Sequence, residues 1–303
     1  MAVKEKTAVN AESIQAVNTV TFKQKMLQYR NHPSSLVLLI LVILCAVITV
    51  GALLFLIAYI LVQGIPNLTP ELFSIEYNSE NASLMPALLN TVLITAISLV
   101  IAVPLGIFAA IYLVEYAKRG NKLVSMVRMT AETLSGIPSI VYGLFGMLFF
   151  VTTLGWGNSL IAGSCTLAIM ILPLIMRTTE EALNTVPDSF REGSFGLGAG
   201  KLRTVFRVIL PTAVPGILSG VILAIGRIVG ESAALIYTAG TIAQYPKDIF
   251  SSTRTLSVHM YLCTNEGLHT SQAYGTAVVL LVLVVIINAL SSFAAKKLTK
   301  KMG

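Results

Sequence analysis

The chain has 303 residues, of which 55% are hydrophobic and only 12% are charged, and its formal net charge is +7. A soluble domain carries about twice that charged fraction, so the composition excludes a soluble protein and predicts an integral membrane protein. The net charge does not indicate nucleic-acid binding, because the basic residues fall in short tracts between apolar runs. The three cysteines have no paired or metal-ligand spacing. We therefore expect no disulfide framework, no bound metal and no cofactor.

Six apolar runs are long enough to cross a bilayer. About 20 apolar residues are needed, and a helix satisfies every backbone polar group inside the membrane. The first run begins too late and is too long for a signal peptide, so we expect it to be retained. The predicted fold is all-α, with six transmembrane helices at 35–62, 86–114, 134–154, 158–176, 212–238 and 274–295.

Local signals add detail to these helices. The sequence GWGN at 155–158 supplies a turn between the third helix and the fourth. Pro138 is expected to kink the third helix. Asn90, at the start of the second helix, is expected to make interhelical hydrogen bonds, with substrate contact as the alternative. Close packing of the fifth helix is predicted by two G-x-x-x-G pairs, Gly216–Gly220 and Gly226–Gly230.

The distribution of Lys and Arg orients the helices, because positive residues stay in the cytoplasm. Basic residues are frequent in four segments, 1–34, 115–133, 177–211 and 296–303. By contrast, 63–85 and 155–158 have none, and 239–273 has only Lys247 and Arg254. The sequence therefore predicts a cytoplasmic tail (1–34), a membrane domain (35–295) and a basic cytoplasmic tail (296–303). Both termini face inward, and loops 63–85 and 239–273 face outward.

The cytoplasmic loop 177–211 has a definite internal order. Pro187 and the following Asp188 suit the start of a short helix, and the glycines at 196, 198 and 200 favour a sharp turn after it. The glycines do not form a nucleotide loop. Such a loop requires G-x-x-x-x-G-K-[ST], whereas Leu202 follows Gly200-Lys201 and Phe195 stands five residues before Gly200. We therefore expect no ATP hydrolysis by this chain.

The same loop resembles the EAA loop of ABC-importer permeases, whose pattern is E-A-A, three residues, G, nine residues and I-x-L-P. Every spacing matches, with Gly and Ser in place of the two alanines and Val in place of Ile. The resemblance implies a coupling helix that docks on a separate ATPase subunit, and the alternative is an interfacial helix that only closes the loop. The matching residues are Glu192, Gly193, Ser194, Gly198, Leu210 and Pro211.

Other stretches resemble the permeases of phosphate importers. SGIPSIVYGLFG (135–146) and GRIVGESA (226–233) are similar to that family, and LPLIMRTTEEALNTVP (172–187) with GLHTSQAYGTAVVLL (267–281) resembles its PstA type. The resemblance implies the type I ABC importer permease fold in a prokaryotic plasma membrane, and a non-catalytic subunit. It also implies a PstC-like second permease, a PstB-like ATPase dimer that holds ATP and Mg, and a PstS-like phosphate-binding protein outside.

Arg227 and Glu231 are the two charges in the fifth apolar run. Four residues apart on a helix, they would share one face and pair. One hypothesis makes Arg227 an anion site on the substrate path, held by Glu231 between transport events, because guanidinium matches phosphate oxygens. The other makes the pair a structural pin between helices. A permease for sulfate, molybdate or tungstate, and a stand-alone secondary transporter, remain as alternatives for the whole chain.

Overall fold

The computed structural model describes residues 33–118, 120–265, 267 and 269–302. The expected tail at 1–34 therefore lies almost wholly outside the described residues. The chain divides into two compact units, residues 1–59 and 60–303. Helix α2 (Pro33–Gly64) supplies the described part of the first unit and runs into the second. Its 32 residues correspond to about 48 Å of helix, more than the roughly 30 Å hydrocarbon core of a bilayer. The first predicted span, 35–62, lies within it.

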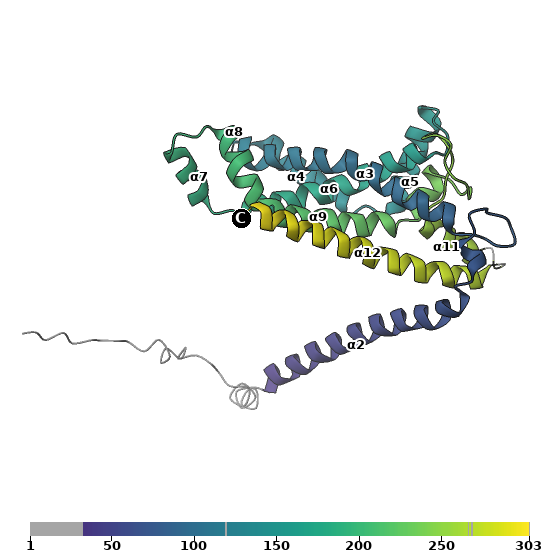
Figure 1. Cartoon of the computed structure of the whole chain (residues 1–303). Coiled ribbons are helices and arrows are strands. Elements are labelled where there is room, and N and C mark those ends of the chain that lie inside the picture. The colour runs from purple at the N-terminus through teal and green to yellow at the C-terminus, as the bar shows by residue number, and fades with distance from the viewer. Residues whose placement is uncertain (1–32, 119, 266, 268, 303) are drawn as a thin grey trace, which may run out of the picture. The chain divides into compact units, whose positions relative to one another are not determined.

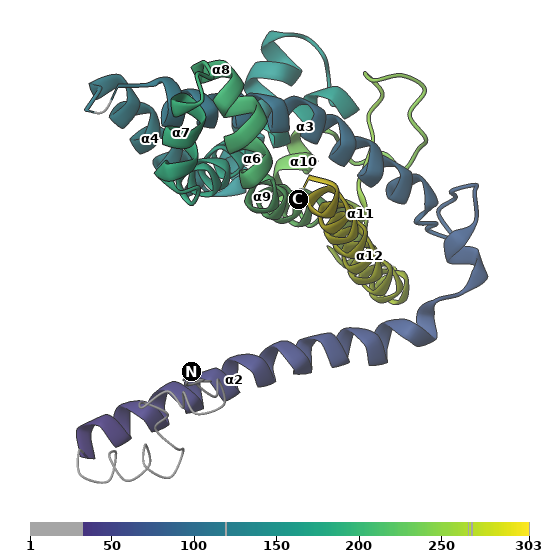
Figure 2. The same ribbon diagram turned by 60° about the vertical axis from the view of Figure 1, so that its left-hand side comes forward.

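The second unit is built from helices joined by turns and by two longer loops, 74–84 and 239–255 (Figures 1 and 2). Three of the helices continue through a π-helical stretch, where hydrogen bonds join residues five apart instead of four. The elements are η2 (Ile65–Asn67), η3 (Pro70–Phe73), α3 (Met85–Ile111) with η4 (Tyr112–Tyr116), α4 (Lys122–Ser135), α5 (Ser139–Gly146) with η5 (Met147–Thr153), α6 (Leu160–Asn184), α7 (Asp188–Gly196), α8 (Lys201–Thr204) with η6 (Val205–Ile209), α9 (Leu210–Val229), α10 (Ala233–Thr238), α11 (Leu256–Asn265) and α12 (Thr270–Met302).

The third predicted span is broken in the structure. α4 and the α5–η5 helix meet at an angle of 102°, so residues 134–154 do not form one straight helix. The kink predicted at Pro138 is confirmed: Pro138 is the N-cap of α5, and the turn Gly136–Pro138 separates the two helices. Within the described residues, five helical stretches are long and apolar enough to cross a membrane, or six if the bent pair is one span.

Helix α6 lies at the centre of the core, with α3 on one side and α9 on the other. Leu167, Ile171 and Ile175 of α6 are fully buried against Ile94 and Ala102 of α3. The predicted close packing of α9 is confirmed for one glycine pair, because a Cβ on Gly220 would lie 2.0 Å from Thr178 Oγ1. At the pair Gly226–Gly230 the described part of the chain shows no close helix, since a Cβ on Gly226 would meet nothing within 4 Å there.

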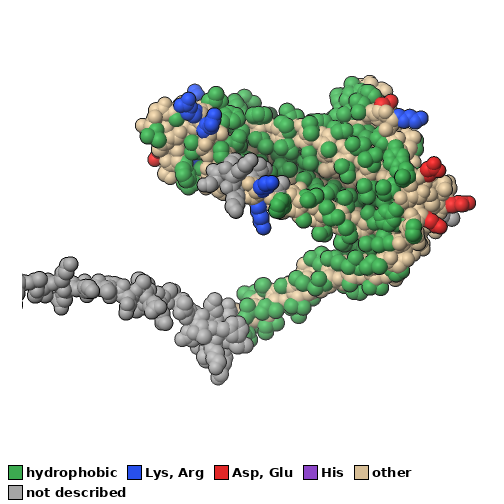
Figure 3. Space-filling model, in the orientation of Figure 1, with side chains coloured by type: hydrophobic (Ala, Val, Ile, Leu, Met, Phe, Trp, Pro, Cys, Tyr) green, Lys and Arg blue, Asp and Glu red, His purple; other side chains and the backbone are tan. Residues whose placement is uncertain are grey.

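Charge is distributed unevenly along the second unit. In Figure 3 an apolar surface covers its middle. Lys and Arg gather at the end that carries α7 and α8, and Asp and Glu gather at the opposite end, where a Lys or Arg also lies. The acidic end includes the loop with Glu71, Glu76 and Glu80. The two ends of the bundle thus differ in sign, as the positive-inside pattern of the sequence predicts.

Candidate translocation and coupling sites

Arg227 lies in the last turn of α9 and lines a hollow of about 570 Å³ between α6, α9 and α12. Arg227 is half-buried, and no hydrogen bond or ion pair joins its guanidinium to another side chain in the described part of the chain. The other residues of the hollow are mainly small or apolar: Leu174, Ser219, Ile222, Leu223, Gly226 and Asn288.

Glu231 does not pair with Arg227, which corrects the prediction of an ion pair on one helix face. α9 ends at Val229 with Gly230 as its C-cap, and the next helix begins only at Ala233. The fifth predicted helix, 212–238, is therefore two helices, and the four-residue spacing that brings side chains together in a continuous helix no longer applies.

Glu231 instead holds the break between α9 and α10 in place. Its carboxylate Oε1 accepts a hydrogen bond of 3.1 Å from the backbone N–H of Ala234, at the start of α10. Its backbone oxygen accepts one of 2.5 Å from the hydroxyl of Ser257, on α11. The side chain is buried, and a carboxylate at a helix N-terminus satisfies an otherwise unpaired N–H and interacts favourably with the dipole.

Asn288 of α12 was not singled out from the sequence, although it shares the hollow with Arg227. Its Oδ1 is buried and has no hydrogen-bond partner among the described residues. A polar amide in the middle of an apolar run is a signal that the sequence did carry, because polar groups inside membrane helices tend to face a bundle interior or an aqueous path.

The short helix predicted after Pro187 is present as α7, and Pro187 is its N-cap as expected. Gly198 follows its C-terminus with φ +79°, in the left-handed region. The N–H of Gly198 donates to the carbonyl of Phe195 at 2.9 Å, and the N–H of Ala199 donates to the carbonyl of Ser194 at 3.1 Å. This pair of bonds is a Schellman motif, which favours glycine in the left-handed position. The left-handed backbone at this position therefore explains why the EAA pattern has a glycine here.

The other residues of the EAA pattern have different surroundings. Glu192 and Gly193 are exposed on α7. Ser194 is half-buried, and its hydroxyl lies 2.9 Å from the hydroxyl of Thr204 on α8. Leu210 and Pro211 stand where η6 continues into α9, inside one helical stretch that runs from Lys201 to Val229. The pattern thus spans α7, the turn after it and the start of α9.

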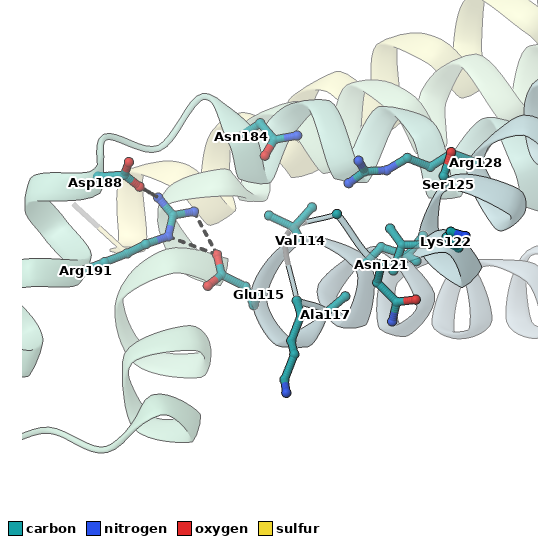
Figure 4. A pocket seen from close by; sticks show the side chains of 14 residues that line it. Val114, Glu115, Ala117, Asn121, Lys122, Ser125, Arg128, Asn184, Asp188 and Arg191 are labelled. Atoms are coloured by element: carbon teal, nitrogen blue, oxygen red, sulfur yellow. Dashed lines mark hydrogen bonds and ion pairs between the residues drawn. The ribbon is translucent and has the colours of Figure 1, made fainter.

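An ion pair between α7 and the end of α3 was not predicted. Arg191 Nη2 lies 2.7 Å from Glu115 Oε1, and the two residues are 76 positions apart in the sequence. Figure 4 shows both side chains at the edge of a cavity of about 820 Å³. The sequence carried no signal for this contact, because each residue is an ordinary charge at the predicted cytoplasmic boundary.

At the opposite end, Asn90 holds the segment before α11. Its amide nitrogen donates to the backbone oxygens of Gln244 (3.0 Å) and Arg254 (3.3 Å). Both acceptors lie in the loop between α10 and α11, so the prediction of a hydrogen bond between helices is wrong: Asn90 links α3 to a loop. His259 of α11 is fully buried. Burial, and then the charge of Arg254, lower the pKa of His259 to about 3. Both effects disfavour the charged form of this imidazole.

Comparison with known proteins gives a consistent picture. Residues 102–303 match the family described as "Binding-protein-dependent transport system inner membrane component". The probable ABC transporter permease protein YqgI of Bacillus subtilis is 34% identical over 277 residues, which cover 86% of this chain and 94% of the relative. The phosphate transport system permease protein PstA 1 of Mycobacterium tuberculosis is 36% identical over 205 residues, 67% of each chain.

Solved structures show the same fold. A chain of the bacterial alginate ABC transporter, in complex with alginate pentasaccharide-bound periplasmic protein, superposes with a TM-score of 0.66 at 15% identity and covers 90% of this chain and 98% of its own. A chain of the MetNI methionine ABC transporter, in an inward-facing conformation, gives a TM-score of 0.56 at 22% identity and covers 71% and 94%. The chain thus belongs to the family of binding-protein-dependent transport system inner membrane components, the permease subunits of ABC importers.

Proposed function

We propose that this chain is the PstA-type permease subunit of an ATP-driven importer of inorganic phosphate. The observation that carries the proposal is the unpaired guanidinium of Arg227 in the hollow between α6, α9 and α12. A cation inside an apolar membrane run is costly unless it serves an anion or a partner. Relatives named as phosphate permeases support the choice of phosphate among oxyanions.

The partners in this proposal follow from the two ends of the molecule. Helix α7 exposes Phe190 and Phe195, and Leu197 after it is 91% exposed. Such an apolar patch on a short helix suits docking into a groove of an ATPase subunit. A second permease, PstC-like, would complete the hollow, and a PstS-like binding protein would deliver phosphate to loops 63–85 and 239–273 in the plasma membrane of a prokaryote.

The direct test is uptake by the native complex. The chain is purified from its own membranes in mild detergent, the copurifying chains are identified, and the complex is reconstituted in vesicles with labelled phosphate. We expect an ATPase to copurify, uptake to require ATP, and a hundredfold excess of sulfate, molybdate or tungstate to leave uptake unchanged. Competition by one of these anions would assign a different oxyanion, and uptake without an ATPase would indicate a secondary transporter.

The proposed orientation has its own test. In a chain that lacks the three native cysteines, single cysteines are introduced at exposed positions of the two ends and treated with a maleimide that cannot cross the membrane. We expect labelling of intact cells at Ser79→Cys and Thr241→Cys, and none at Ser125→Cys or Ser189→Cys; all four side chains are exposed in the structure. Permeabilised cells should label at every position. The opposite pattern in intact cells would place the termini outside.

A further inference from the structure

Arg191 uses every N–H group of its guanidinium, which distinguishes it from the other arginines of the described chain. Nε and Nη2 donate to Glu115 Oε1 at 3.1 and 2.7 Å. Nη1 donates to the carbonyl of Val186 at 2.8 Å and to Asp188 Oδ1 at 3.0 Å, and Nη2 donates to the carbonyl of Leu183 at 3.1 Å. Guanidinium has five N–H donors, so none is left unpaired.

These bonds join α7 to two membrane helices. Glu115 lies in η4, the π-helical end of α3, and only 8% of its side chain is exposed. Leu183 is in the last turn of α6, and Val186 lies just beyond it. The last carbonyls of a helix have no partner within it, and a cation beside them also complements the helix dipole. One side chain on α7, only 16% exposed, therefore contacts the ends of both α3 and α6, and Figure 4 shows its contact with Glu115 of η4.

Helix α7 has little else to hold it against the membrane helices. None of its residues is fully buried, and its largest apolar side chains, Phe190 and Phe195, are about half exposed. The ammonium of Lys201, on α8, lies 5.1 Å from the centre of the Tyr116 ring, also in η4. Since apolar burial is what usually fixes one helix on another, the polar contacts to η4 and α6 fix this one.

We propose that Arg191 and Glu115 are a positioning pair that transmits movement of α7 to α3 and α6. The inference rests on the proposed role of α7 as a coupling helix. A guanidinium held by a carboxylate and two helix-end carbonyls fixes both the distance and the orientation of α7. When an ATPase subunit displaces α7, the ends of α3 and α6 move with it. Without the pair, α7 stays docked on the ATPase, but its movement is no longer transmitted to α3 and α6.

The test compares variants of the pair in the complete importer. Glu115→Gln, Arg191→Gln and the double variant remove the pair, while Arg191→Lys keeps the charge but not the planar five-donor geometry. The matched control is the double variant Arg177→Gln with Glu181→Gln. It removes an exposed ion pair of similar length, 3.1 Å, that lies within α6 and joins no two elements. Phosphate transported per ATP hydrolysed is measured in vesicles, together with ATPase copurification.

The movement itself is measured with spin labels. Cysteines replace Ser189 on α7 and Phe108 on α3, both exposed, in the chain without native cysteines. The distance between the labels is recorded without nucleotide and with ATP and vanadate. In the unmodified pair we expect a narrow distance distribution in both states. In all four variants of the pair, we expect a broad distribution and about a tenfold loss of phosphate per ATP, with normal copurification, because charged hydrogen bonds are lost. The control should match the parent chain.

The outcomes separate this inference from the proposed function. A narrow distribution with unchanged phosphate per ATP in Glu115→Gln would overturn the inference. Glu115→Gln keeps the carbonyl bonds of Arg191, so it remains informative if Arg191→Gln does not assemble. Unchanged phosphate per ATP together with a narrow distance distribution in Arg191→Lys would also overturn the inference, since a point charge at position 191 would then be enough to position α7. Absence of ATP-driven phosphate uptake in the parent chain would instead refute the proposed function, and the distance distributions would still decide whether the pair fixes α7.

Discussion

Replacement of Gly198 by valine is expected to reduce ATP-driven uptake by at least about tenfold while the chain still inserts in the membrane. Gly198 has φ +79° and closes the C-terminus of α7. A left-handed conformation costs an L-residue about 1–2 kcal/mol, and more for a β-branched side chain. The space around Gly198 is open, with nothing within 4 Å of an added Cβ, so the effect comes from the backbone and not from a clash. Uptake and ATPase copurification are measured together.

Graded substitutions at and near Gly198 isolate the conformational effect. Asparagine tolerates the left-handed region, so Gly198→Asn should retain more uptake than Gly198→Ala, and Gly198→Val should retain least. Gly196→Ala is the control, because Gly196 is helical and equally open, and alanine favours helix. Tryptophan at 198 adds bulk to the same strain and should also prevent docking. Full uptake with valine or tryptophan at 198 would remove the coupling role of this turn.

The elements that the sequence predicted well depend on local signals. α7 was expected between Pro187 and the glycines, and it runs from Asp188 to Gly196. Its ends are decided by residues within a few positions, namely a proline that suits a helix start and a glycine that suits a left-handed cap. The kink at Pro138 is local in the same sense. Its angle of 102° was not predictable, because packing of α5 against α10 and α6 decides where the chain continues.

The break after α9 shows that a run of apolar residues does not reveal every helix end. The run 212–238 carries no charge except at Arg227 and Glu231, and only three residues, 230–232, separate the two helices. An interruption this short leaves the average polarity of the run unchanged. What maintains it is a contact with a distant segment, the bond from Ser257 to the backbone of Glu231. The contact of Arg191 with Glu115 was missed for the same reason, since a pair 76 residues apart leaves no spacing to recognise.

Arg227→Ala is expected to abolish phosphate uptake, and Arg227→Lys to lose most of it, with assembly preserved in both. An anion that leaves water for a narrow path must replace its hydration with donors from the protein. Arginine offers five in a fixed planar arrangement, whereas lysine offers a point charge that deprotonates more readily when buried. Because Arg227 makes no ion pair within the described chain, its loss leaves no carboxylate unpaired. Uptake of labelled phosphate and the copurified subunits are the measurements.

Glu231 provides the comparison that separates an anion site from a structural pair. Glu231→Gln should keep most of the uptake, because a glutamine oxygen can still accept the bond from the N–H of Ala234 that now ends on the carboxylate. Glu231→Ala removes that acceptor and should destabilise the start of α10 by about 1 kcal/mol. The double variant Arg227→Gln with Glu231→Gln should transport no better than Arg227→Gln alone, since the two side chains do not meet in the structure. Restored transport in the double variant would mean that the charges only compensate each other, and Arg227 would then not be an anion site.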